Sequence, residues 1–199
     1  METRSTGQAG FAMFEDSLGG KWLELLSEIA PGLKRAAIIF NPETATANAS
    51  TYMPSFETAA QSLKVEATTA PVHDDVEIET AIIALGREPG GGLVVTSDAF
   101  MTAHRVPAIL AAVRNNVPAV YHNSNFTRDG GLLSYGLDLV DNYRRAATYV
   151  DRILRGEKPG DLPVQFPTKF EMVLNRKTAK ALGLAIPPSI LLRADEQIE

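Results

Sequence analysis

Short apolar runs alternate with longer amphipathic stretches over the first two thirds of the chain. The apolar runs include AAIIF at 36–40 and GLVV at 92–95. Such runs predict strands that are buried on both faces of a sheet, and the stretches between them predict helices of about ten to fifteen residues. The alternation therefore predicts a three-layer α/β/α lobe with a mainly parallel sheet. The predicted strands are 35–40, 65–72, 92–96, 117–121 and 132–135, and the predicted helices are 16–30, 47–63, one that begins at Asp74 or Asp75, and 100–115. Residues 123–129 are predicted to form a short helix or a turn.

The last third of the chain has a different pattern. The stretch NYRRAATYVDRILRG at 142–156 predicts a strongly amphipathic helix that ends at Gly156. An extended connection rich in proline and glycine follows, and then come a predicted strand at 170–175, a short helix at 176–182 and a polar tail.

Composition narrows the class of protein without identifying a partner. The 199 residues are 45% hydrophobic and 22% charged, which is typical of a globular protein with a packed core. The net charge of -5 argues against a nucleic-acid surface, and the absence of cysteine excludes disulfides and thiolate chemistry. No apolar run approaches the roughly 18–20 residues that span a bilayer. The first ten residues lack the apolar segment of a secretory signal, so a cytoplasmic location is expected if Met1 is the true start.

Polar side chains follow four of the predicted strands. Ligands of parallel α/β sheets bind at the carboxyl ends of the strands, and hydroxyl, amide, carboxylate and aromatic groups there suit a small polar ligand. The same residue types cap helices and form turns, so each position alone also has a purely structural explanation. The candidate ligand-binding residues are Asn41, Thr96, Ser97, Asp98, Tyr121, His122, Asn123, Tyr135 and Asp138.

Signals for catalysis, metals and cofactors are weak. The adjacent residues His73, Asp74 and Asp75 rarely converge on one ion, and helix capping explains the aspartates. The Gly-Gly-Lys at 19–21 lacks both the first glycine and the Ser/Thr of a phosphate-binding loop, and no nucleophile elbow of a hydrolase is present. We therefore expect no metal, no cofactor and no catalytic residues. Trp22, the only tryptophan, is expected to be a core or interface anchor.

Two long stretches resemble one family. GGKWLELLSEIAPGLKRAAIIFNPET at 19–44 is similar to the start of the second lobe of ABC-transporter substrate-binding proteins of the type I periplasmic-binding-protein fold. The segment from 130 to the end, which contains YRRAATYVDRILRGEKPGDLPVQ, resembles the C-terminal part of the same family. The family includes tryptophan and tyrosine binders. The specificity of the resemblance comes from its length, since no single short piece is diagnostic.

The resemblance implies two α/β lobes that close on a ligand by a hinge motion. It also implies a membrane permease as partner, a periplasmic location and no enzymatic activity. If the family's binding site is transferred to this chain, the resemblance implies that the candidate residues line the cleft. In that site Asp98 or Asp138 pairs with a ligand amine, and Tyr121 or Tyr135 stacks on an apolar part of the ligand. The implied domains are a second lobe at 10–138, a first-lobe helix and strand at 139–175, and a C-terminal helix and tail at 176–199 that returns to the second lobe.

Family members are longer than this chain, so we expect an N-terminally truncated form. In such a form the apolar face of the helix at 142–156, formed by Ala146, Ala147, Val150, Ile153 and Leu154, would be exposed. A homodimer or a domain exchange through that face is therefore predicted. Two other interpretations stay open. One is a ligand-sensing regulatory domain of the same fold, and the other is a flavodoxin-like or hydrolase enzyme that uses Asp98 and His122.

Overall fold

The computed structural model describes residues 10–12, 15–45 and 48–199. The chain divides into two compact units. The larger unit comprises Asp16–Gly136 and Glu171–Glu199, and the smaller unit comprises Met1–Glu15 and Leu137–Phe170.

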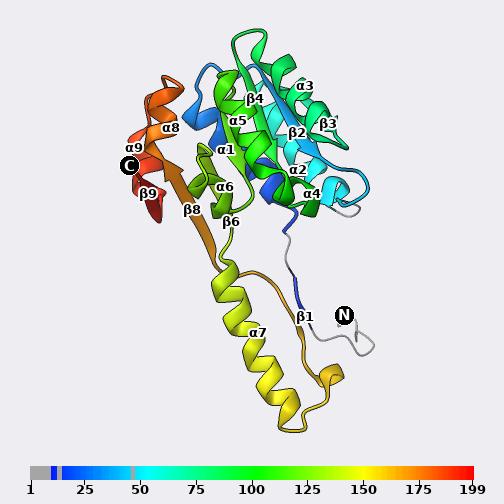
Figure 1. Cartoon of the computed structure of the whole chain (residues 1–199). Coiled ribbons are helices and arrows are strands. Elements are labelled where there is room, and N and C mark those ends of the chain that lie inside the picture. Colours follow the sequence, from blue (N-terminus) through cyan, green and yellow to red (C-terminus); the bar gives the residue numbers. More distant parts are fainter. Residues whose placement is uncertain (1–9, 13–14, 46–47) are drawn as a thin grey trace. The chain divides into compact units, whose positions relative to one another are not determined.

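The larger unit is built on a seven-stranded sheet with the order β3-β2-β4-β5-β6-β8-β9 (Figure 1). The pairs from β3 through β6 are parallel, and so is the pair of β8 and β9. These findings confirm the predicted α/β class with a mainly parallel sheet. The strands are β2 (Arg35–Phe40), β3 (Glu66–Pro71), β4 (Gly91–Val95), β5 (Ala119–Tyr121), β6 (Leu133–Leu137), β8 (Phe170–Asn175) and β9 (Glu196–Ile198).

Helices cover both faces of this sheet (Figure 1). Ala37, Ile39, Leu93 and Val95 of β2 and β4 face one apolar core, which also contains buried residues of α3 and α5. The alternate residues Ala36, Ile38 and Val94 face the opposite layer and are also buried. Burial on both faces explains why the strands are continuously apolar in the sequence. The helices are α1 (Leu18–Ile29), α2 (Asn48–Leu63), α3 (Asp75–Gly86), α4 (Ala99–Ala103), α5 (Arg105–Arg114), α6 (Ser124–Arg128), α8 (Arg176–Ala181) and α9 (Pro188–Arg193).

The glycine pair at 19–20 serves helix packing. A Cβ atom on Gly19 would lie 2.2 Å from the Tyr52 carbonyl oxygen, and one on Gly20 would lie 2.9 Å from that of Ser55. Both glycines therefore allow α1 and α2 to pack closely, which explains the pair without a phosphate. The expected burial of Trp22 is confirmed, because its side chain is fully buried and its ring contacts Tyr52 edge to face.

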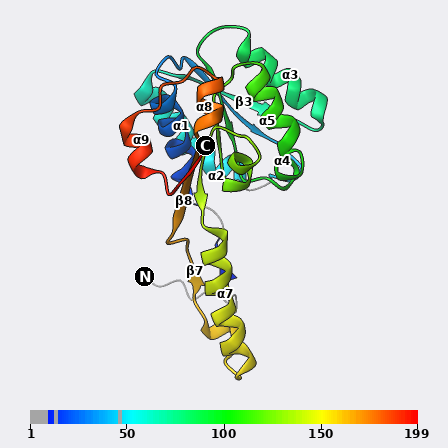
Figure 2. The same ribbon diagram turned by 60° about the vertical axis from the view of Figure 1, so that its left-hand side comes forward.

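Two predicted elements differ in the structure. The helix expected at 100–115 is divided at His104 into α4 and α5, and His104 Nδ1 lies 2.6 Å from Asp75 Oδ1 at the start of α3. The C-terminal stretch, for which only a polar tail was expected, forms α9 and β9. Helix α9 lies beside α1 (Figure 2), where Ser189 and Arg193 donate hydrogen bonds to Glu28. Tertiary contacts thus order a segment whose local pattern is weak.

Strand β8, which covers the predicted strand at 170–175, lies in the seven-stranded sheet between β6 and β9. The Asn175 N–H at its end donates to the Leu132 carbonyl oxygen just before β6, so β8 and β6 run in opposite directions. Residues 10–12 form part of the smaller unit.

The smaller unit contains a helix and a two-stranded parallel sheet. Its elements are β1 (Gly10–Phe11), α7 (Leu139–Leu154), the 3₁₀ helix η1 (Pro159–Asp161) and β7 (Val164–Gln165). One side of α7 packs on the strands, because the Tyr149 ring lies 4.9 Å from that of Phe11 and its hydroxyl donates to the Pro163 carbonyl at 2.7 Å. On another side Val140, Tyr143, Val150 and Leu154 are exposed. Of the face predicted to be exposed, only Ala146 is partly buried.

Among the described residues, no helix combines the length and the apolar character needed to cross a bilayer.

Candidate functional site

The carboxyl ends of β2, β4, β5 and β6 meet at one edge of the larger unit's sheet. The register pairs Ile39 with Val95, Val95 with Tyr121, and Tyr121 with Ser134. The residues that follow each strand therefore lie next to one another, as expected at the ligand-binding edge of a parallel sheet. Eight of the nine candidate residues lie in the larger unit at this edge, and Asp138, which directly follows β6, belongs to the smaller unit.

Asp98 is buried and its carboxylate is occupied by internal hydrogen bonds. Oδ2 accepts from the Asn41 N–H at 2.6 Å, and Oδ1 accepts from the Phe100 N–H at 2.8 Å and from the Thr44 hydroxyl. The carboxylate thereby caps α4 and ties the end of β4 to the end of β2. These bonds account for a buried aspartate without a ligand.

Asn41 and Thr96 also serve the framework. The Asn41 side-chain oxygen accepts from the Glu43 N–H at 2.8 Å and from the Thr44 N–H at 3.2 Å, which is a turn stabilised by the asparagine itself. The fully buried Thr96 hydroxyl donates to the Ile39 carbonyl oxygen at 3.4 Å. Both residues hold the strand ends in place and have little surface left for a ligand.

Tyr121 belongs to the apolar core. Its ring is buried and stacks on Phe126 with 4.9 Å between the centroids. Burial raises the pKa of the Tyr121 hydroxyl above its usual range. Stacking of Tyr121 on a ligand would need an exposed face of the ring, and this ring is covered by protein.

His122 and Asn123 form a hydrogen-bonded pair at the end of β5. The Asn123 side-chain oxygen accepts from the Asn125 N–H at 3.0 Å, so its Nδ2 donates to His122 Nε2 at 2.7 Å. The ring proton then resides on Nδ1, and this atom is buried. Burial lowers the pKa of His122 to about 4. A hydrogen bond with the Val95 backbone and the negative charge of Asp98 act to raise the pKa, but burial outweighs them. At neutral pH the ring is therefore an uncharged hydrogen-bonding group.

Of the candidate residues in the larger unit, Ser97, His122, Asn123 and Tyr135 keep partial exposure at this edge. The Tyr135 backbone is fixed, because its carbonyl oxygen accepts from Trp22 Nε1 at 2.6 Å. The edge therefore offers hydroxyl, amide, imidazole and aromatic groups on a rigid frame, a lining suited to binding a small polar molecule.

Two further residues at this edge escaped the sequence analysis. The Thr44 hydroxyl bonds Asp98, and the partly exposed Phe100 ring stacks on His104 with 4.1 Å between centroids. Both lie within a few residues of a strand end, so a wider window after β2 and β4 would have included them.

Asp138 lies in the smaller unit. It caps α7 by accepting from the Asp141 N–H at 2.9 Å, and its other oxygen pairs with Lys169 Nζ at 2.8 Å. The hydrogen bond from Lys169 lowers the pKa of Asp138, helped by the Asp141 backbone. Capping and pairing within its own unit explain this carboxylate.

Within the described part of the chain, no cluster of three or more His, Asp or Glu side chains could hold a metal ion. His73 Nδ1 instead lies 2.9 Å from Glu77 Oε2, and the Asp74 carboxylate caps α3. The metal-like triplet at 73–75 is thus used for local contacts at a helix start.

The larger unit is an α/β lobe with a mainly parallel sheet, and comparison with known proteins assigns the chain to a family. The profile of the ABC transporter substrate binding protein family matches residues 14–198. The chain therefore belongs to that family, whose members are binding proteins and are typically periplasmic or extracellular.

Individual relatives are similar over most of the chain. A tyrosine-binding protein of Clostridioides difficile is 24% identical over 164 residues, which are 82% of this chain and 47% of that protein. A conserved domain protein of Vibrio cholerae has 26% identity and a TM-score of 0.83, with 95% of this chain and 62% of that one covered. An ABC domain from Streptococcus pneumoniae solved in complex with L-Trp has 22% identity and a TM-score of 0.79, with 90% and 62% covered, and this likeness supports the fold alone. The chain thus spans about half to three fifths of the length of these relatives.

Proposed function

We propose that this chain is the solute-binding part of an ABC importer, and that it binds its ligand at the carboxyl ends of β2, β4, β5 and β6. The observation that carries the proposal is the gathering of partly exposed polar and aromatic side chains from adjacent parallel strands at one edge. Membership of the family supports binding without catalysis.

The proposed ligand is an amino acid with an aromatic side chain. Relatives are described as a tyrosine-binding protein and as a complex with L-Trp. Tyr135 and Phe100 supply aromatic surface at the strand ends, and His122 and Asn123 supply hydrogen-bonding groups beside them. Because the Asp98 carboxylate already accepts three internal hydrogen bonds, we assign it to the frame of the site and not to the ligand amine.

A thermal-shift screen of the twenty amino acids tests the proposal. A true ligand at about 100 times its dissociation constant adds roughly 2.7 kcal/mol to the free energy of unfolding. L-tryptophan or L-tyrosine should stabilise the chain, and tryptamine and tyramine, which lack the carboxylate, should do so less.

Matched histidine variants localise the binding. His122→Gln should weaken the calorimetric affinity at least about tenfold, since a lost hydrogen bond to a charged group has that order of effect. His73→Gln, at an exposed position of the same unit, should leave affinity unchanged. If no amino acid stabilises the chain, or if both variants bind like the wild type, the site assignment fails.

The proposed partner is a membrane permease, and the proposed location is outside the cytoplasmic membrane, as for the family. Fractionation of the native cells would contradict this location if the protein were found only in the cytosol.

We further propose self-association through α7. The exposed residues Val140, Tyr143, Ala147, Val150 and Leu154 recur at alternating intervals of three and four residues, the spacing by which two helices pack. A second copy that presents the same face would cover both, either in a homodimer or by domain exchange. Sedimentation equilibrium is the measurement that decides this.

A further inference from the structure

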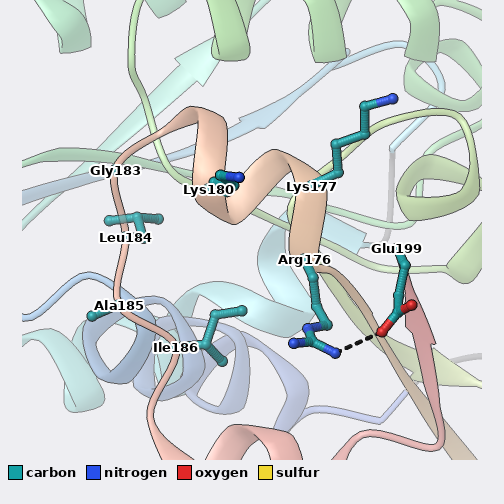
Figure 3. A pocket seen from close by; sticks show the side chains of 8 residues that line it. All are labelled: Arg176, Lys177, Lys180, Gly183, Leu184, Ala185, Ile186 and Glu199. Atoms are coloured by element: carbon teal, nitrogen blue, oxygen red, sulfur yellow. Dashed lines mark hydrogen bonds and ion pairs between the residues drawn. The ribbon is translucent and has the colours of Figure 1, made fainter.

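A pocket of about 690 Å³ lies beside α8, at the other edge of the sheet from the candidate site. Helix α8 follows the end of β8, which meets the beginning of β6 through the Asn175–Leu132 hydrogen bond. The candidate site lies where β6 ends. Figure 3 shows side chains of α8 on one side of the pocket and residues of the following loop on another.

The orientation of α8 is fixed by its inner face. The Asn175 side chain caps the helix by accepting from the Thr178 N–H at 2.9 Å, and it donates to the Thr127 carbonyl at 3.2 Å. The Thr178 hydroxyl donates to the Gly130 carbonyl at 2.8 Å, and Ala179 is fully buried. These contacts leave the three cationic side chains of the helix exposed, namely Arg176, Lys177 and Lys180.

A turn after α8 supplies the apolar wall. Gly183 has φ +66, a left-handed conformation that favours glycine, and the Leu184 N–H donates back to the Ala179 carbonyl at 2.9 Å. The chain is thereby reversed, so that Leu184, Ala185 and Ile186 line the pocket beside the cations (Figure 3).

The charges in the pocket are not balanced. Arg176 pairs with Glu199 at 2.8 Å. In contrast, neither Lys177 nor Lys180 has a hydrogen bond or an ion pair with any residue in the described ranges. Three cations thus face one carboxylate, in a chain whose net charge is -5. Two unpaired lysines and several aliphatic residues line the same pocket, a combination that suits a molecule with a negative head and an apolar body.

We propose that this pocket binds an amphipathic anion. Its carboxylate or phosphate group pairs with Lys177 and Lys180, and its hydrocarbon part lies against Leu184 and Ile186. The volume is in the usual range for small-molecule sites, about 300–1,000 Å³. The site is separate from the strand-end site and does not depend on the amino-acid ligand proposed for it. A free fatty acid and an anionic lipid share this chemistry.

Decanoate is the probe for the free acid, and decanamide is its uncharged counterpart. In nitrogen-15 correlation spectra of the whole chain, decanoate should produce saturable shifts concentrated at residues 176–186, and decanamide should produce weak ones. Lys177→Gln/Lys180→Gln should raise the decanoate dissociation constant at least about tenfold, because it removes both charge-assisted contacts. Lys64→Gln/Lys158→Gln, which removes two exposed lysines elsewhere, should bind like the wild type.

Vesicle flotation distinguishes the two sources of the anion. Flotation with phosphatidylglycerol vesicles that requires Lys177 and Lys180, together with decanoate binding, would identify a lipid as the natural source, and decanoate binding alone would identify a free acid. The proposal is overturned by shifts scattered over the surface, by equal binding of decanamide, or by equal affinities of the two double variants. Flotation without decanoate binding would also overturn it, since attraction to a charged surface needs no pocket.

Discussion

Helices α1 and α7 are both amphipathic, and their surroundings are opposite. In α1, the side chains of Trp22, Leu26 and Ile29 are fully buried. In α7, Leu154 is 81% exposed and Val140 is 67% exposed. Helix α1 packs against α2 and the sheet of the larger unit, whereas one side of α7 packs on the short strands β1 and β7 of the smaller unit.

The difference shows that an apolar stripe specifies a face to be covered without specifying what covers it. In the larger unit, two helical layers and seven strands are present, and the stripe of α1 is part of the core. In the smaller unit, the sheet has two strands. Burial of apolar surface contributes roughly 25 cal/mol per Å² to the stability of the folded state. The exposed apolar face of α7 therefore contributes little until another surface covers it.

The largest expected effect is on the free energy of unfolding, which should depend on the apolar side chains of α1 much more than on those of α7. Leu26→Ala should lower the free energy of unfolding by about 2–5 kcal/mol, because it leaves a cavity next to Gly92 in a fully packed layer. Leu154→Ala should change it by less than about 0.5 kcal/mol at a protein concentration where the chain is monomeric. Urea denaturation followed by circular dichroism measures both. Equal losses would show that the α7 face is already packed.

The second prediction concerns self-association of the chain through α7. Leu154→Asp should weaken self-association at least about tenfold in sedimentation equilibrium, because a charge would have to be buried between the two helices. Lys64→Gln, an exposed substitution in the larger unit, should leave association unchanged. A wild-type chain that stays monomeric at high concentration would end the dimer proposal.

The smallest effect is a difference in pH dependence. Burial lowers the pKa of His122 to about 4 in the folded state, so between pH 6.5 and about 4 the unfolded chain binds the extra proton. The associated stability is complete above pH 6.5 and declines as the pH falls through this window, by on the order of 1 kcal/mol for a partly exposed ring. His122→Gln should flatten the stability curve there, and His73→Gln should not.

Asp138 of the smaller unit provides the contrast. Its pKa is lowered by the Lys169 hydrogen bond, so its contribution is complete above its ordinary value of 3.8 and declines as the pH falls below it. Asp138→Asn should therefore alter the stability curve only at the acid end. If Asp138→Asn and His122→Gln change the free energy of unfolding over the same pH range, the contacts of these two residues do not explain their pKa shifts.

Much of the fold was predictable because the strands are local apolar runs. Strands β2 and β8 agree with their predicted bounds, and the predicted cap at the start of α3 is the Asp74 carboxylate. The break at His104 and the ordering of α9 and β9 were not predictable, because they depend on contacts with residues such as Asp75 and Glu28 that are distant in the sequence.

The candidate site was predicted only as a set of positions. The rule for parallel sheets located the strand ends, but it could not separate Asp98 and Tyr121, which hold the frame, from His122 and Asn123, which keep exposed surface. Capping residues and binding residues are chemically alike, and only their neighbours decide which role is possible.

The sequence by itself determined the layers of the larger unit, since alternating apolar periods of strand and helix allow few other arrangements. Only the tertiary structure decided which polar groups are consumed by internal bonds, which lysines of α8 are left without a partner, and where the strand 170–175 belongs. The physical reason is that periodicity is a property of neighbouring residues, whereas the pairing of hydrogen bonds and charges is settled between segments that meet only after folding.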